Sequence, residues 1–130
     1  MKISFDNALG LFPKSLELRA KRTELLASNL ANADTPGYKA RDFDIDRILQ
    51  EANPRQIPLQ TTRPEHLAPS TDGIEGQLAY RVPQQASLDG NTVEEHIEQA
   101  KFAENALRYQ TTLRFINGKI SSLMLALRGE

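Results

Sequence analysis

The sequence predicts a mainly α protein, in which N- and C-terminal heptad helices form a coiled-coil-like inner domain. An irregular, proline-rich middle segment with short strands separates the two helices. Apolar residues recur at alternating steps of three and four near both chain ends, and six of the seven prolines fall between residues 34 and 90. We therefore expect three zones, 1–33, 34–90 and 91–130, with the first and last forming one discontinuous domain.

The first zone carries a helical stripe that runs into residue 30. Pro13 suits the first turn of a helix and not its interior, so we expect a continuous helix from about Pro13 to Asn32. A shorter or kinked turn should precede it. Arg19 interrupts the stripe, whose other members are Phe5, Leu9, Phe12, Leu16, Thr23, Leu26 and Leu30.

The stretch "SNLANADTPGYKARDF", residues 28–43, ends this helix abruptly. Proline at position 36 presets φ near the value that the first central position of a type II turn requires, and glycine at 37 accepts the positive φ of the second. Proline also disfavours helical backbone at the residue before it. We expect a defined helix exit built on Asn29, Asn32, Thr35, Pro36, Gly37 and Tyr38.

The middle zone reads as loops with a few short elements. A brief helical turn is expected around Asp46–Ala52, and residues 57–62 look extended. Residues 76–83 alternate Leu78, Tyr80 and Val82 before a proline, which predicts one short strand.

The last zone holds the strongest helical pattern, predicted to run from 92 to 128. Asn91 or Thr92 can cap it, and Thr92 and Glu95 have the capping-box spacing. Gly118 could mark a close helix approach. The main stripe consists of Phe102, Ala106, Tyr109, Leu113, Ile116, Ile120, Leu123 and Leu127, and a second comprises Val93, Ile97, Ala100, Ala103 and Leu107.

The two helices differ in length, and this difference leaves apolar surface uncovered. At 1.5 Å per residue the longer helix spans about 55 Å, against roughly 30–42 Å for its partner. The surplus favours burial between subunits, with terminal helices that are mobile in an isolated chain. The alternative is a self-contained helical hairpin with a loop segment folded over it.

No pattern for catalysis or cofactor binding stands out. The chain has no Cys and a formal net charge of −1, with basic residues dispersed, which argues against thiolate sites and nucleic-acid binding. His96 reads as part of a solvated face and His66 as a packing or hydrogen-bonding residue. The acidic run Asp42, Asp44 and Asp46 lacks the glycine and distal glutamate of a calcium loop and reads as a solvated strand leading to a helix cap. We expect no enzyme activity, cofactor, metal or small-molecule substrate.

Two stretches resemble a known family. "ASNLANADTPGYKARDFD" is similar to the signature of the flagellar rod and hook axial proteins, and "YRVPQQASLDGNTVEEHIEQAKFAENALRYQTTL", residues 80–113, resembles their short proximal rod members. "RPEHLAP" at 63–69 resembles a His-containing segment that such proteins carry in mid-chain. The resemblance covers nearly the whole chain and is weakest across 46–60.

The resemblance implies a structural subunit of the flagellar basal body rod, crossing the periplasm, enclosing the export channel and required for motility. Implied partners are further copies of this chain, proximal and distal rod proteins, the MS ring with its rod adaptor, and the flagellar type III export apparatus. The N-terminus lacks a cleavable signal pattern, which agrees with that export route. A soluble helical adaptor or export chaperone is the alternative. Interface residues would be Leu9, Phe12, Leu16, Leu26, Leu30, Phe102, Tyr109, Leu113, Ile116, Ile120, Leu123 and Leu127.

Overall fold

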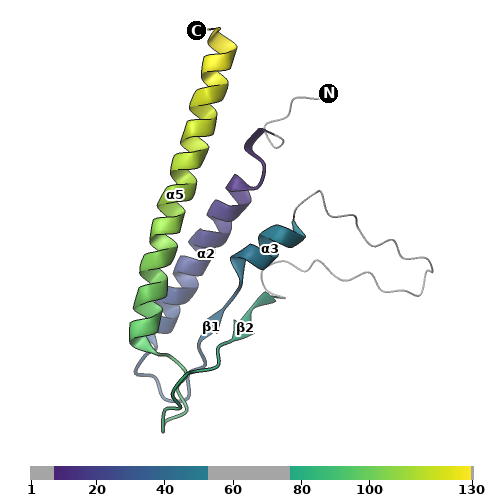
Figure 1. The fold of residues 1–130 in the computed structure, drawn as a ribbon. Helices are drawn as coiled ribbons and strands as arrows, with labels where there is room; N and C mark the ends of the chain where they lie inside the picture. The colour runs from purple at the N-terminus through teal and green to yellow at the C-terminus, as the bar shows by residue number, and fades with distance from the viewer. Residues whose placement is uncertain (1–7, 53–76, 130) are drawn as a thin grey trace, which may run out of the picture.

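A computed structural model describes residues 8–52 and 77–129 and confirms the mainly α class. Figure 1 shows two helices, α2 and α5, lying side by side, with a small two-stranded sheet and the short helix α3 beside α2. The elements in chain order are α2 (Phe12–Ala31), β1 (Arg41–Asp42), α3 (Ile45–Glu51), β2 (Ala79–Tyr80) and α5 (Glu95–Arg128).

Helix α2 begins where the proline rule predicts. Pro13 lies in its first turn, and Gly10, just before it, has a left-handed φ of 59° that separates the helical backbone of residues 8 and 9 from α2. The predicted bounds, Pro13 to Asn32, differ from the observed ones by one residue at each end.

Helix α5 begins later than predicted, at Glu95, because the expected capping box does not form. The residue before the helix is Glu94, which makes no side-chain cap. The hydroxyl of Thr92 instead accepts a hydrogen bond from the backbone N–H of Ala40, 2.8 Å away. The Thr92 hydroxyl, which a capping box would need as its acceptor, is therefore used in a tertiary contact. At the other end Gly129, with φ 72°, terminates the helix in the left-handed conformation typical of such glycines.

The two long helices pack antiparallel along a line that is largely polar. The amide of Asn29 donates to Glu98, Asn105 donates to the carbonyl of Arg19 and the hydroxyl of Thr23, and further along the rings of Phe12 and Phe115 stack with centroids 6.0 Å apart. The buried residues of α5 are Glu98, Asn105 and Thr112, spaced seven apart.

Within this chain the buried line of α5 is therefore polar, and the apolar stripe lies beside it. Phe102, Tyr109 and Ile116 flank the polar line and are half-buried, whereas Leu113 and Ile120 are exposed. Gly118 does not mark a close helix approach here either, since a Cβ added to it would meet nothing within 4 Å.

The middle segment folds against the other side of α2. Strands β1 and β2 pair antiparallel, with Arg41 opposite Tyr80 and Asp42 opposite Ala79. Asp44 caps α3 by accepting from the N–H groups of Asp46 and Arg47, as its position in the acidic run predicts. An apolar core lies between α2 and the middle segment. It consists of Leu18, Phe43, Ile45 and Ile48, with Leu25 and Leu49 packed against it.

Two details of the middle segment differ from the predictions. The strand at 76–83 is present but only two residues long, and its alternating Tyr80 and Val82 point to solvent at 71% and 87% exposure. Asp42 is not solvated, because two arginines pair with it. His96 is exposed as expected. Some predictions lie outside the described residues: the stretch 57–62, predicted to be extended, the 63–69 segment with His66, and Phe5.

Candidate assembly site

The exit from α2 is a type II-like turn, as predicted. The N–H of Tyr38 donates to the carbonyl of Thr35 at 3.3 Å, which closes the four-residue turn, and Gly37 has φ 71°. Ahead of it, the side chain of Asn32 donates to the carbonyl of Ser28 and accepts from the hydroxyl of Thr35. Signature residues therefore satisfy the backbone groups that the helix end leaves free.

Asn91 closes the same helix end from a distant part of the chain. Its buried amide nitrogen lies 3.0 Å from the carbonyl of Asn32, 2.6 Å from that of Ala33 and 3.0 Å from that of Thr35. Its Oδ1 accepts from the N–H of Val93, 2.7 Å away. One side chain thus gathers three carbonyls just after the end of α2, of which those of Asn32 and Thr35 also accept a backbone N–H within the turn.

Residues 89–92 also bond to residues 37–40 through their backbones. Gly37 donates to the carbonyl of Asp89 and Thr92 donates to that of Tyr38, both at 3.0 Å. Gly90 has φ 78°, and a Cβ on it would lie 3.8 Å from the Cα of Gly37. We call the two segments, 28–43 and 87–93, the joint.

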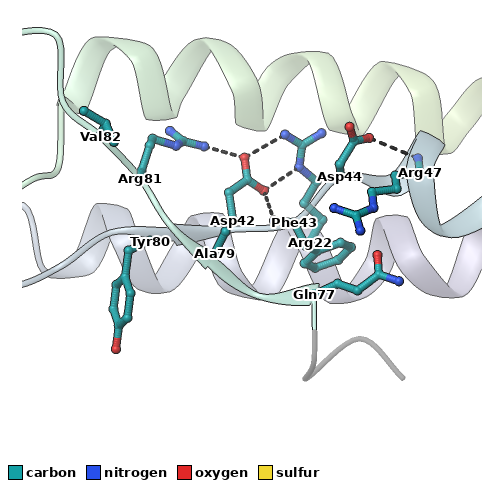
Figure 2. A pocket seen from close by; sticks show the side chains of 10 residues that line it. All are labelled: Arg22, Asp42, Phe43, Asp44, Arg47, Gln77, Ala79, Tyr80, Arg81 and Val82. Carbon is teal, nitrogen blue, oxygen red and sulfur yellow. Dashed lines mark hydrogen bonds and ion pairs between the residues drawn. The ribbon is translucent and has the colours of Figure 1, made fainter. Parts of the chain in front are cut away.

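A cluster of ion pairs connects the joint to both α2 and α5. Asp42 on β1 accepts two hydrogen bonds from Arg22 of α2, at 2.9 and 2.8 Å, and also pairs with Arg81, which follows β2. Figure 2 shows Arg22 and Arg81 on either side of the Asp42 carboxylate. Arg81 bonds in turn to the fully buried Glu98 of α5, so the cluster ties four elements together.

The cluster changes the proton affinity of its members. Burial alone would raise the pKa of Asp42, but the hydrogen bonds and charges of Arg22 and Arg81 outweigh it and hold that pKa below its usual value of 3.8. The hydrogen bond to Asp42 raises the pKa of Arg22 against the opposing effect of burial. The Asp42 carboxylate is therefore ionised across the physiological range.

Asn29, in the helix-exit signature, connects the cluster to the turn. It is fully buried, and its nitrogen donates to the carbonyl of Arg41 and to Glu98, at 2.9 and 3.1 Å. Its oxygen accepts from the hydroxyl of Tyr38 and the N–H of Arg41, at 3.4 and 3.3 Å. All hydrogen-bonding positions of this amide are engaged, which indicates a positioning role and not one in catalysis.

The open hollow beside the cluster has the volume of a small ligand site, about 470 Å³, but not its chemistry. Its charged lining residues are already paired with one another or solvent-exposed (Figure 2). Within residues 8–52 and 77–129 no group of three or more His, Cys, Asp and Glu side chains could hold a metal ion. No helix of this described part is long and apolar enough to span a membrane.

The comparisons with known proteins decide the family. The family model described as flagella basal body rod protein matches residues 16–39. Over 132 positions the chain is 48% identical to the flagellar basal body rod protein FlgB of Aeromonas hydrophila, covering 100% of this chain and 99% of that protein. The chain belongs to the FlgB family of flagellar basal body rod proteins.

Other FlgB relatives agree over nearly their full lengths. FlgB of Cereibacter sphaeroides is 48% identical over 97% of this chain and 98% of its own, and FlgB of Escherichia coli strain K12 is 42% identical over 95% and 94%. Membership confirms the predicted class, a structural rod protein, and gives no support to a soluble adaptor or export chaperone.

In this FlgB-family chain the predicted interface residues have three different environments. Leu26 is fully buried within the chain, so it is no longer a candidate for contact with a neighbour, and Leu9, Leu16, Leu30, Phe102, Tyr109, Ile116 and Leu123 are half-buried. Phe12, Leu113, Ile120 and Leu127 are exposed, at 37%, 41%, 40% and 86%. We call the exposed apolar side chains of the C-terminal half of α5 the distal face: Leu113, Phe115, Ile120, Met124, Leu125 and Leu127. Phe115, at its edge, also stacks on Phe12 of α2.

Sequence reasoning missed the role of Asn91 in the joint and the roles of Arg22, Arg81 and Glu98 in the charged cluster. The sequence assigns Asn91 and Thr92 to capping the helix that follows, whereas the Asp-Gly-Asn chemistry of residues 89–91 is typical of a turn whose side chains bond to backbone. That signal could have predicted a polar loop, but not the helix end that the loop caps.

Proposed function

We propose that this chain is a non-enzymatic structural subunit of the proximal rod, the part of the flagellar drive shaft between the MS ring and the distal rod. The observation that carries the proposal is the mismatch between the helices. Helix α2 has 20 residues and α5 has 34, so α5 extends well past its partner and leaves the distal face uncovered. Figure 1 shows this unpartnered end of α5 reaching beyond the start of α2.

The distal face has the composition of a subunit interface. Its six large apolar side chains lie on one helix that α2 covers only in part, and such concentrations usually mark association sites. Burying each one contributes roughly 1.5–3 kcal/mol. In the proposed rod, neighbouring helices would cover this face and enclose the export channel.

The joint has a complementary role in this proposal. Because its hydrogen bonds are satisfied within the chain, it would hold the middle segment at a constant angle to the helices in every copy. A shaft that transmits torque needs this rigidity between its parts. The partners would be further copies, other proximal and distal rod proteins, the ring with its adaptor, and the flagellar type III apparatus that exports the chain. The assembled rod would cross the periplasm.

The test is a charge placed in the distal face. Ile120→Asp and Leu113→Asp should abolish motility and rod growth in a strain that lacks its own copy, because assembly would bury an unpaired carboxylate. Each purified variant should keep the unfolding temperature of the parent within about 2 °C, since both side chains are exposed in the single chain. Ile120→Leu is the control and should swim normally.

Swimming by both aspartate strains would overturn the rod function. The adaptor alternative makes a different prediction for the purified chain, a complete fold as monomer or dimer that resists proteolysis along all of α5. Size-exclusion chromatography and limited proteolysis of the full chain distinguish the two.

A further inference from the structure

Arg19 is buried in α2 without an acidic partner. Its residue exposure is 8%, and it forms no ion pair or side-chain hydrogen bond with the described residues. Its Nε is shielded from solvent and unpartnered. Arg22, one turn further along the same helix, is instead bidentate on Asp42. The same residue that interrupts the predicted stripe is therefore a buried charge left uncompensated.

The nearby carboxylates do not compensate Arg19. Asp46 and Glu104 attract its guanidinium, but Glu104 is paired with Arg108 at 2.6 Å, and Arg108 repels Arg19. Burial is the main cause that lowers the pKa of Arg19. Across the interface, Oδ1 of Asn105 is likewise buried and lacks a donor.

The terminal nitrogens of Arg19 are open to an incoming group. Nε is the one guanidinium atom recorded as both buried and unpartnered in the described part of the chain. The two terminal nitrogens have no partner there either, so they keep contact with solvent. A guanidinium held by packing, with terminal nitrogens that lack a partner among the described residues, is pre-organised for a bidentate carboxylate.

We propose that Arg19 binds a carboxylate from a second copy of this chain when copies assemble. The proposal rests on the proposed rod function and adds a specific charge pair to it. Charge complementarity supports a second copy, because Glu24 and Asp34 are exposed and form no ion pair with the residues that the structure describes. A water molecule at Arg19 would satisfy a hydrogen bond but would leave the charge uncompensated.

The first experiment separates stability from assembly. Arg19→Met keeps the packed stem and removes the charge, so the unfolding temperature of the purified full chain should rise, on the order of 3 °C. In cells the same variant should reduce motility at least tenfold in swim-ring growth. Arg22→Met is the matched control, and its unfolding temperature should fall because Asp42 loses a partner. A fall for Arg19→Met, or normal swimming, would overturn the inference.

The second experiment identifies the occupant. Arg19→Glu should block rod growth, and combining it with Glu24→Lys or with Asp34→Lys should restore swimming in one of the two pairs by exchanging the charges between copies. Failure of both pairs would overturn a contact of Arg19 with Glu24 or Asp34 of a second copy. The proposed function fails separately, through normal swimming of both Ile120→Asp and Leu113→Asp; if those two variants are immotile while Arg19→Met swims, only the Arg19 inference is lost.

Discussion

The N-terminal half of α5 lies against α2 and the joint, where its buried side chains, Glu98 and Asn105, are polar and hydrogen-bonded. The C-terminal half is the reverse, with apolar Ile120, Met124 and Leu127 exposed. Polar groups inside specify one arrangement because each needs a particular partner, whereas an apolar face accepts any surface of suitable shape. One helix therefore combines a unique contact within the chain with a surface suited to contact between chains.

The largest expected difference between the two halves is in local opening. Backbone amides of residues 116–127 should exchange with solvent on the order of 100-fold faster than those of residues 98–112, because no second helix within residues 8–52 and 77–129 packs along the distal half. Hydrogen exchange of the purified chain, followed by mass spectrometry, measures this. Equal protection along the whole of α5 would mean that the distal half is stable without neighbours.

The joint should be most sensitive at Asn91. Asn91→Asp replaces the donor that serves three carbonyls with a carboxylate facing them, and we expect a loss of about 4 kcal/mol in the free energy of unfolding. Leu88→Ala, in the same loop but fully exposed, should change it by less than about 0.5 kcal/mol. Urea denaturation of both variants gives the comparison, and similar values would remove Asn91 from the joint.

The charged cluster should make stability depend on pH. Because the pKa of Asp42 is depressed in the fold, its contribution is present above the unfolded value of 3.8 and is lost as the pH falls through the lower native value. Asp42→Asn should cost about 2 kcal/mol at pH 7. The difference in the free energy of unfolding between the parent and Asp42→Asn should become smaller below pH 3.8. A difference that stays constant from pH 7 to pH 2 would contradict the paired carboxylate.

The smallest expected effects concern two glycines, and they have opposite signs. Gly37→Val forces a side chain into φ 71° and should destabilise the chain by about 1–2 kcal/mol. Gly118→Ala, within α5 and with open space around it, should stabilise the helix by about 0.5–1 kcal/mol. Thermal unfolding measures both, and a destabilising Gly118→Ala in the single chain would show a contact that the structure does not contain.

Local rules predicted the elements and missed the contacts between them. Pro13, Gly37 and Asp44 act on their own backbone neighbours, so the start of α2, the exit turn and the cap of α3 follow from sequence. The capping box at Thr92 failed because a distant N–H, that of Ala40, bonds to its hydroxyl. An analysis of apolar spacing could not identify the helix contact through Glu98, Asn105 and Thr112, since all three are polar.

The seven-residue spacing of Glu98, Asn105 and Thr112 also fixes the register of α5 along α2. Sliding α5 along α2 by one heptad would separate Asn105 from the carbonyl of Arg19 and Glu98 from Asn29, at a displacement of about 10 Å. Such a slip is costly, so every molecule presents an overhang of the same length. In a polymer, identical overhangs keep positional errors from accumulating from one copy to the next.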